Sequence, residues 1–297
     1  MTAEMATTFV DAEIRRQPAS WTRAVELAPQ VGPLLPQHGE RVAVIGCGTS
    51  WFMAAAYAAL REQAGAGETD CFAASQFPAA RGYDRVVAIS RSGTTTEVVA
   101  ALEQSAAPAV AITAVDDSPV ARAAGSTILL DFADEQSVVQ TVFATTTLML
   151  LRASLGQSLE YVVEQASAVL AGDPTTGADD AHQVTFLGQG WAYGIAQEAA
   201  LKMREAAQLW TESYLQMEYR HGPIAIAEPG RAVWVFGTAV DGLRANIAAT
   251  GASLVDDDLD PVADLVRAQL LGVRRAQLQG LDADRPRSLT RSVVLPH

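Results

Sequence analysis

The chain has 297 residues, 49% of them hydrophobic, which is enough for two domains with sizeable cores. The formal net charge is −13 and no basic stretch is visible, so we expect no nucleic-acid partner. Two cysteines, Cys47 and Cys71, form no disulfide framework and favour a cytoplasmic location. Neither a signal peptide nor an apolar stretch long enough to span a bilayer is found, so no membrane partner is expected.

Apolar runs alternate with helix-forming runs through the first half of the chain. The first 35 residues are predicted to be helical. Strands are predicted at 42–45, 70–73, 86–90, 109–113 and 127–130, and helices at 51–63, 95–105 and 136–155. This alternation is typical of parallel βαβ units.

The pattern then restarts after a stretch rich in Gly, Pro, Asp and Thr. The sequence VTFLGQGWAYGIA at 184–196 repeats VAVIGCGTSWFMA at 42–54, and further strands are predicted at 232–236 and 252–255. We therefore predict an α/β fold with two tandem three-layer (αβα) domains, each built on a parallel sheet. The predicted divisions are an N-terminal helical segment at 1–36, a first domain at 37–170, a linker at 171–183, a second domain at 184–280 and a tail at 281–297.

The glycine-rich turn GCGTSW at 46–51 allows three interpretations: a dinucleotide site, a phosphate site or a simple turn. Trp51 stands where the dinucleotide fingerprint has its third glycine, and Asp70 alone is a weak ribose signal. The dinucleotide interpretation is therefore disfavoured. Because the turn holds no Walker lysine, a nucleoside triphosphatase is not predicted either. Cys47 is expected to pack at the strand end as a small apolar side chain.

A second polar turn, SRSGTTTE at 90–97, follows another predicted strand and opens a helix. Helix N-termini present free amide donors to anions, although Ser and Thr at this place can equally be simple caps. Thr49 and Ser50 end the neighbouring strand, and the carboxyl edge of an open sheet is where ligands bind. Together the two turns favour a phosphate site. The second half has VFGTAVDG at the equivalent place, so one such site is expected per chain.

The run AQEAALKMREAAQLWTES at 196–213 is predicted to be one helix. Glu198, Lys202 and Glu205 fall on one stripe of it, continued by Leu209 and Glu212. The stripe is either a solvated face of ion pairs or part of a site. The four histidines are scattered and form no ligand pair, so no metal site is predicted.

Several stretches in this order resemble one family. They are EIRRQP (13–18), GCGTS (46–50), ASQF (74–77), SRSGTTTE (90–97), EQSVVQT (135–141), FLGQGWAYGIAQEAALKMRE (186–205), EYRHGP (218–223) and DRPRSLTRSV (284–293). The chain resembles the double sugar-isomerase (SIS) domain proteins. These comprise the isomerase half of glucosamine-6-phosphate synthase and stand-alone relatives, among them aminosugar-6-phosphate deaminases and fructosamine-6-phosphate deglycases.

The resemblance implies a role for each matching residue. The implied phosphate ligands are Ser50, Ser90, Arg91, Ser92 and Thr95, and the implied sugar contacts are Thr49 and Val138. The implied catalytic residues are Glu205 as the base, Lys202 beside it, His221 for ring opening, and Arg291, which stands where several relatives carry a functional lysine. In relatives the histidine comes from the neighbouring subunit and the C-terminal tail covers the site, so the resemblance implies a homodimer. It implies no cofactor.

The predicted function is the conversion of an aminosugar 6-phosphate to a ketose 6-phosphate with release of ammonia. Because the sequence begins at the SIS-like region, glutamine-driven synthesis is not expected. The alternatives within enzymes are a fructosamine-6-phosphate deglycase and another phosphosugar isomerase. A phosphosugar-binding sensor without turnover is the alternative outside enzymes.

Overall fold

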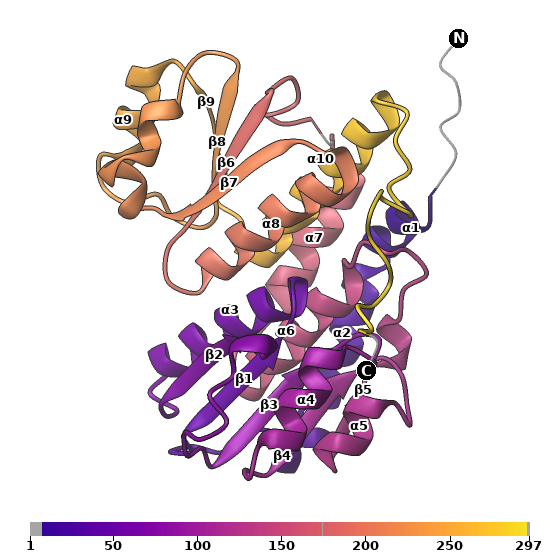
Figure 1. Cartoon of the computed structure of the whole chain (residues 1–297). Coiled ribbons are helices and arrows are strands. Elements are labelled where there is room, and N and C mark those ends of the chain that lie inside the picture. Colours follow the sequence, from indigo (N-terminus) through magenta and orange to yellow (C-terminus); the bar gives the residue numbers. More distant parts are fainter. Residues whose placement is uncertain (1–7, 174, 296–297) are drawn as a thin grey trace. The chain divides into compact units, whose positions relative to one another are not determined.

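The computed structural model describes residues 8–173 and 175–295 (Figure 1). It is an α/β fold with two parallel sheets, of order β2-β1-β3-β4-β5 and β7-β6-β8-β9. The strands are β1 (Val42–Gly46), β2 (Thr69–Ala73), β3 (Arg85–Ile89), β4 (Ala109–Thr113), β5 (Thr127–Leu129), β6 (Gln183–Gly188), β7 (Trp210–Leu215), β8 (Arg231–Val235) and β9 (Ser253–Asp256).

Helices connect these strands. The α-helices are α1 (Phe9–Arg15), α2 (Gln17–Val31), α3 (Thr49–Gln63), α4 (Thr96–Gln104), α5 (Pro119–Ala124), α6 (Val142–Ser154), α7 (Glu160–Ala171), α8 (Ala192–Ala207), α9 (Leu243–Thr250) and α10 (Pro261–Leu278). Short 3₁₀ turns are η1 (Gly32–Leu34), η2 (Ala74–Gln76), η3 (Asp131–Ala133), η4 (Glu218–His221) and η5 (Pro223–Ile226). None of the helices in the described ranges is long and apolar enough to cross a membrane.

Both sheets begin with the predicted strand, glycine turn and helix. β1 and β6 occupy the same place, second in their sheets, and end at Gly46 and Gly188. A Cβ at Gly46 would lie 2.7 Å from the carbonyl carbon of Ser50, and one at Gly188 would lie 2.3 Å from the carbonyl oxygen of Ala192. Each glycine therefore lets the following helix approach its strand closely. This shared requirement explains the repeated sequence pattern.

The core of the first sheet lies on both faces of its strands. All five residues of β1 are buried, as parallel sheets covered on both faces require. On one face, side chains of β1, β3 and β4 pack against α4 and α5. This cluster includes Ile45 and Val86 from the strands and Val98, Leu102 and Val120 from the helices. Cys47 packs at the margin of this cluster, as predicted.

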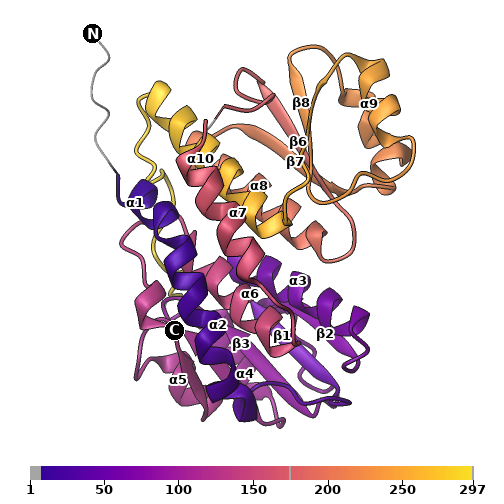
Figure 2. The same ribbon diagram turned by 180° about the vertical axis from the view of Figure 1, so that it is seen from behind.

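The contacts divide the chain into two compact units whose boundaries differ from the predicted ones. The first-sheet unit comprises the described residues of 19–135, 142–160 and 290–297, and the second-sheet unit those of 1–18, 136–141 and 161–289. The predicted helical segment 1–36 and the predicted tail 281–297 are thus each divided between the units. Within the second-sheet unit, α10 packs along α8 and contacts α1 (Figure 2).

Two predicted helices are shorter than expected. The helix predicted at 136–155 begins only at Val142, because residues 136–141 belong to the other unit. The helix predicted at 196–213 ends at Ala207; Gln208 has a positive φ of 51°, and the β-favouring residues that follow form β7. Leu209 and Glu212 therefore do not extend the stripe of Glu198, Lys202 and Glu205.

Candidate active site

The hydroxyl-rich turn after β3 is the first candidate site, and it lies in the first-sheet unit. Ser90 and Ser92 are buried, and the hydroxyls of Ser90 and Thr95 lie 3.3 Å apart just before α4. Gly93 has φ +65°, and a Cβ there would lie 2.1 Å from Oγ of Ser118. Only glycine fits this turn, which places buried hydroxyls at a helix N-terminus, an arrangement suited to an anion.

Thr49 and Ser50 lie at the neighbouring turn. They are the buried first residues of α3, and Gly48 precedes them with φ +54°. β1 and β3 are adjacent and parallel, so both turns follow the carboxyl ends of neighbouring strands. The structure thus brings the predicted phosphate-binding hydroxyls to one edge of one sheet, where open α/β sheets bind ligands.

The C-terminal tail lies along the same turn. Oγ of Ser292 is 3.0 Å from both Oγ of Ser92 and Oγ1 of Thr94. The Thr96 amide donates to the carbonyl of Val293 at 3.3 Å, and the Leu295 amide donates to Oγ1 of Thr96 at 3.0 Å. Residues 290–295 are therefore bound to the start of α4 within the first-sheet unit.

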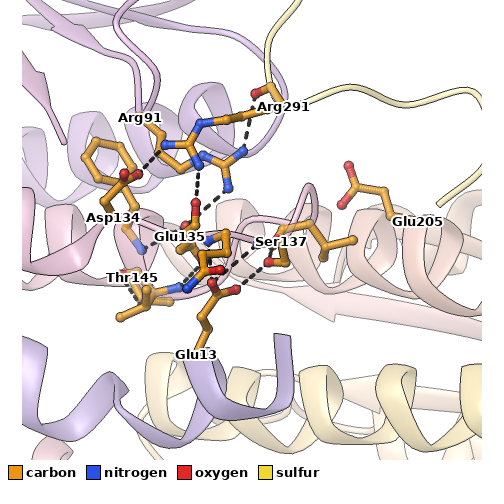
Figure 3. A network of polar contacts seen from close by, with 12 residues as sticks. Glu13, Arg91, Asp134, Glu135, Ser137, Thr145, Glu205 and Arg291 are labelled. Carbon is orange, nitrogen blue, oxygen red and sulfur yellow. Dashed lines mark hydrogen bonds and ion pairs between the residues drawn. The ribbon is translucent and has the colours of Figure 1, made fainter. Parts of the chain in front are cut away.

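The guanidinium of Arg91 is buried and pairs with groups inside the protein. It lies 3.6 Å from the carboxylate of Glu135, both side chains are no more than 1% exposed, and it donates to the carbonyl of Arg291 at 3.2 Å (Figure 3). Glu135 also accepts the amides of Val142 and Phe143 at 2.8 and 3.3 Å, which caps the start of α6. A role for Arg91 at a phosphate stays a prediction.

Arg291 anchors the tail. Its guanidinium donates to the carboxylate of Asp134 and to the carbonyl of Glu135 (Figure 3). These contacts fix the backbone of the tail at the residue before Ser292. They give no support to the predicted catalytic role of Arg291, which stays a prediction, and they explain why a long cation stands at this position.

A second candidate site lies on α8 in the second-sheet unit. Nζ of Lys202 lies 2.5 Å from Oε2 of Glu205 and 3.4 Å from Oε1 of Glu198. Lys202 and Glu198 are 2% and 1% exposed, and Glu205 is 18% exposed. The stripe is therefore a buried charge cluster and not a solvated face, with Glu205 as its member accessible to solvent.

Glu205 opens into a depression of about 510 Å³. Arg204, Gln208, Trp210, Arg287 and Leu289 share its lining, all of them in the second-sheet unit. Burial on one side and a paired lysine leave this carboxylate one open face. Such a group can exchange a proton with a bound small molecule.

Val138 lies in a six-residue segment, 136–141, that belongs to the second-sheet unit. Its amide donates to the carbonyl of Asp284 at 2.9 Å. Val139 and Thr141 of the same segment line a small cavity together with Lys202. The structure thus brings this predicted sugar-contact segment to the helix that carries Glu205.

His221 is exposed at the end of η4, next to the buried Tyr219. In the described residues, no three His, Cys, Asp or Glu side chains form a cluster that could hold a metal ion. Sequence reasoning missed the structural roles of Glu13, Glu135 and Asp284. The only signal for them was that each lies inside a matching stretch of the resemblance.

Comparison with known proteins gives a family match for the first part of the chain. Residues 35–155, which hold the first sheet and both hydroxyl turns, match the family model described as SIS domain. The part of the chain that holds the first sheet is therefore similar to a SIS domain. The match leaves the second sheet outside it.

Relatives extend the similarity to most of the chain. Glutamine–fructose-6-phosphate aminotransferase (isomerizing) of Pectobacterium atrosepticum is 28% identical over 91% of this chain and 54% of its own length. The same enzyme of Escherichia coli K12 is 26% identical over the same shares. The chain spans about half the length of the curated relatives it matches.

Solved structures share the fold of both units. Glucosamine-6-phosphate deaminase of Thermotoga maritima superposes with a TM-score of 0.81 at 23% identity, covering 97% of this chain and all of that one. The C-terminal domain of glucosamine-fructose-6-phosphate aminotransferase from Francisella tularensis has a TM-score of 0.78 at 19% identity, covering 96% of this chain and all of that one. At this identity the likeness concerns the fold alone.

Proposed function

We propose that this protein converts an aminosugar 6-phosphate, of the glucosamine 6-phosphate type, to a ketose 6-phosphate with release of ammonia. The observation that carries the proposal is the Lys202–Glu205 pair, a half-buried carboxylate beside a fully buried ammonium. The hydroxyl turns at 49–50 and 90–95, in the first-sheet unit, support a substrate that carries a phosphate.

In the proposed mechanism Glu205 moves one proton between neighbouring carbons. It takes the proton from C2 of the open-chain aminosugar and returns it to C1, while a second proton passes from the amine nitrogen to the aldehyde oxygen at C1, which leaves a hydroxyl at C1 and an imine at C2. Water adds to this imine, ammonia departs, and the ketone remains. The ammonium of Lys202, 2.5 Å from the carboxylate, holds Glu205 in place during the transfer.

We further propose that the active form is a homodimer to which His221 is contributed by the partner chain. Its exposure at the end of η4 supports this assignment, because a histidine that serves a neighbouring subunit must lie on the surface of its own chain. A protein that is strictly monomeric and fully active would contradict this part of the proposal.

The test is an assay of ammonia release and ketose formation with a panel of phosphorylated aminosugars, fructosamines and plain aldoses. Ammonia with ketose 6-phosphate from the aminosugars supports the proposal. Release of a free amino acid from fructosamine 6-phosphates would instead indicate a deglycase, and aldose–ketose exchange without ammonia a plain isomerase. Tight binding of a phosphosugar without any turnover would indicate a sensor.

A further inference from the structure

The segment 136–141, here called the strap, is set apart from its neighbours in the chain. Residues 19–135 and 142–160 belong to the first-sheet unit, whereas the strap belongs to the unit that carries α8. The strap forms no helix or strand, so hydrogen bonds from other elements must determine its backbone conformation.

The carboxylate of Glu13 on α1 binds the start of the strap. Its Oε1 accepts the backbone amides of Gln136 and Ser137 at 2.5 and 3.3 Å, and its Oε2 accepts the Ser137 hydroxyl (Figure 3). Glu13 is 5% exposed. A buried acidic side chain that receives three donors from two consecutive residues fixes the strap where it enters the unit.

Asp284 binds both the N-terminus of α1 and the strap. Its carboxylate accepts the amides of Phe9 and Val10 at 2.9 and 2.8 Å, at the N-terminus of α1. Its carbonyl accepts the amide of Val138 at 2.9 Å. α1, Asp284 and the strap are thus tied together by five backbone amides and one hydroxyl.

The strap in turn lies against the helix with the catalytic candidates. Val139 and Thr141 line one cavity with Lys202 of α8, and Val10 and Ile14 of α1 line it as well. α1 therefore touches both the strap and the surroundings of Lys202. A shift of α1 or a loss of Glu13 would move the strap relative to the Lys202–Glu205 pair.

We propose that Glu13 is a positioning residue of the active site: it holds the strap so that the strap backbone binds the sugar part of the substrate beside Glu205. The proposal rests on the proposed function and adds to it that α1 is part of the sugar-binding apparatus. Glu13, the strap and Glu205 all lie in the second-sheet unit, so the proposal concerns the sugar part of the substrate.

The test compares Glu13→Ala, which removes the acceptor, with Glu13→Gln, which keeps one acceptor oxygen. Asp11→Ala is the matched control, because Asp11 is a carboxylate of the same helix whose ion pair is with the exposed Arg15. Two quantities are measured for each protein: hydrogen exchange of a peptide covering 136–141, and the ratio of the Kd of inorganic phosphate to that of glucosamine 6-phosphate.

We expect Glu13→Ala to speed exchange of the strap at least tenfold and to lower the Kd ratio about 10- to 100-fold, with the Kd of phosphate changed less than twofold. Glu13→Gln should restore most of the ratio, and Asp11→Ala should leave both quantities unchanged. Unchanged strap exchange in Glu13→Ala would overturn the proposal. So would an equal loss of phosphate and phosphosugar binding, which indicates general destabilisation.

Both measurements are independent of turnover, so the two proposals fail separately. A wild-type protein that binds phosphosugars without converting them contradicts the proposed function, yet the Kd ratio still tests Glu13. Where turnover is observed, kcat of Glu13→Ala should fall about 10- to 100-fold, because a strap displaced by about 1 Å misaligns the substrate with Glu205.

Discussion

Lys202 and Glu205 form an ion pair one helical turn apart on α8, with 2.5 Å between Nζ and Oε2. The lysine is 2% exposed and the glutamate 18% exposed. The ammonium is therefore shielded from solvent, and its charge interacts with the carboxylates of Glu198 and Glu205. This relationship makes Glu205 the member of the pair that a substrate can reach.

Replacing Glu205 by Gln should lower kcat about 10²- to 10⁴-fold, the usual contribution of a general base. The amide keeps the size of the side chain but cannot accept the C2 proton. The check is steady-state ammonia release with the best substrate of the panel. Glu212→Gln on β7 is the control, because Glu212 is a carboxylate that accepts a hydrogen bond from the hydroxyl of Tyr214. A kcat within tenfold of wild type would show that another group is the base.

Replacing Ser92 by Ala should weaken binding of a 6-phosphate sugar about 10- to 100-fold, because a hydrogen bond to a charged group contributes about 1.5–3 kcal/mol. Binding of the matching sugar without phosphate should not change. Calorimetric titration with both ligands measures the difference. Ser75→Ala, at an exposed position after β2, serves as the control. Equal affinities of wild type and variant for the phosphosugar would place the anion site elsewhere.

Arg291 and Asp134 should be energetically coupled as an anchor of the tail. Their side chains are 38% and 40% exposed, so we expect a coupling of about 0.2–1 kcal/mol that weakens as salt is added. The measurement is a double-mutant cycle with Arg291→Met and Asp134→Asn, read as hydrogen exchange of residues 291–295. Arg287→Met, in the exposed part of the tail, is the control. Additive effects of the two substitutions would mean that the pair does not hold the tail.

Asp264 should make stability depend on pH. Burial raises the pKa of this carboxyl from 3.8 to about 6, while the indole of Trp234 and the guanidinium of Arg267 partly offset the rise. The folded state thus binds the proton more tightly, so the stabilisation is complete below about pH 4 and is lost as pH rises to about 6. The loss amounts to about 3 kcal/mol.

Denaturant unfolding of wild type and Asp264→Asn at pH 4, 5, 6 and 7 tests this prediction. The variant has no ionisable group at this position. The unfolding free energy of the wild type should therefore fall relative to that of the variant by about 2 kcal/mol between pH 4 and pH 7. Asp258→Asn, at an exposed position, should follow the wild type. Parallel pH profiles of Asp264→Asn and wild type would contradict the raised pKa.

Cys47 should be chemically inert near neutral pH. Burial, together with the carboxylate of Glu97, raises the pKa of its thiol to about 11, so about one thiol in a thousand is ionised at pH 8. In a Cys71→Ser background, alkylation by iodoacetamide should quicken about tenfold per pH unit from pH 8 to pH 10. A rate that levels off near pH 8.5 would reveal an ordinary thiol.

The elements that depend on local pattern were predictable. The strands β1, β3 and β4 are short apolar runs that end in polar turns, and alternation with helices indicated parallel sheets. Gly46 and Gly188 marked the repeated turn, since the close approach of strand and helix excludes any side chain there. The boundary of α8 was not predictable from periodicity, because the residues of β7 continue the same spacing of polar and apolar residues.

The sequence by itself thus determined the α/β class, the duplicated strand–glycine–helix pattern, the two hydroxyl turns and the stripe of Glu198, Lys202 and Glu205, because these depend on neighbours within a few residues. Tertiary structure alone decided that the stripe is buried, that Arg291 holds the tail, and that Glu13 binds the strap 123 residues away. The partner of a buried charge is chosen by packing between distant segments, and spacing along the chain carries no record of that choice.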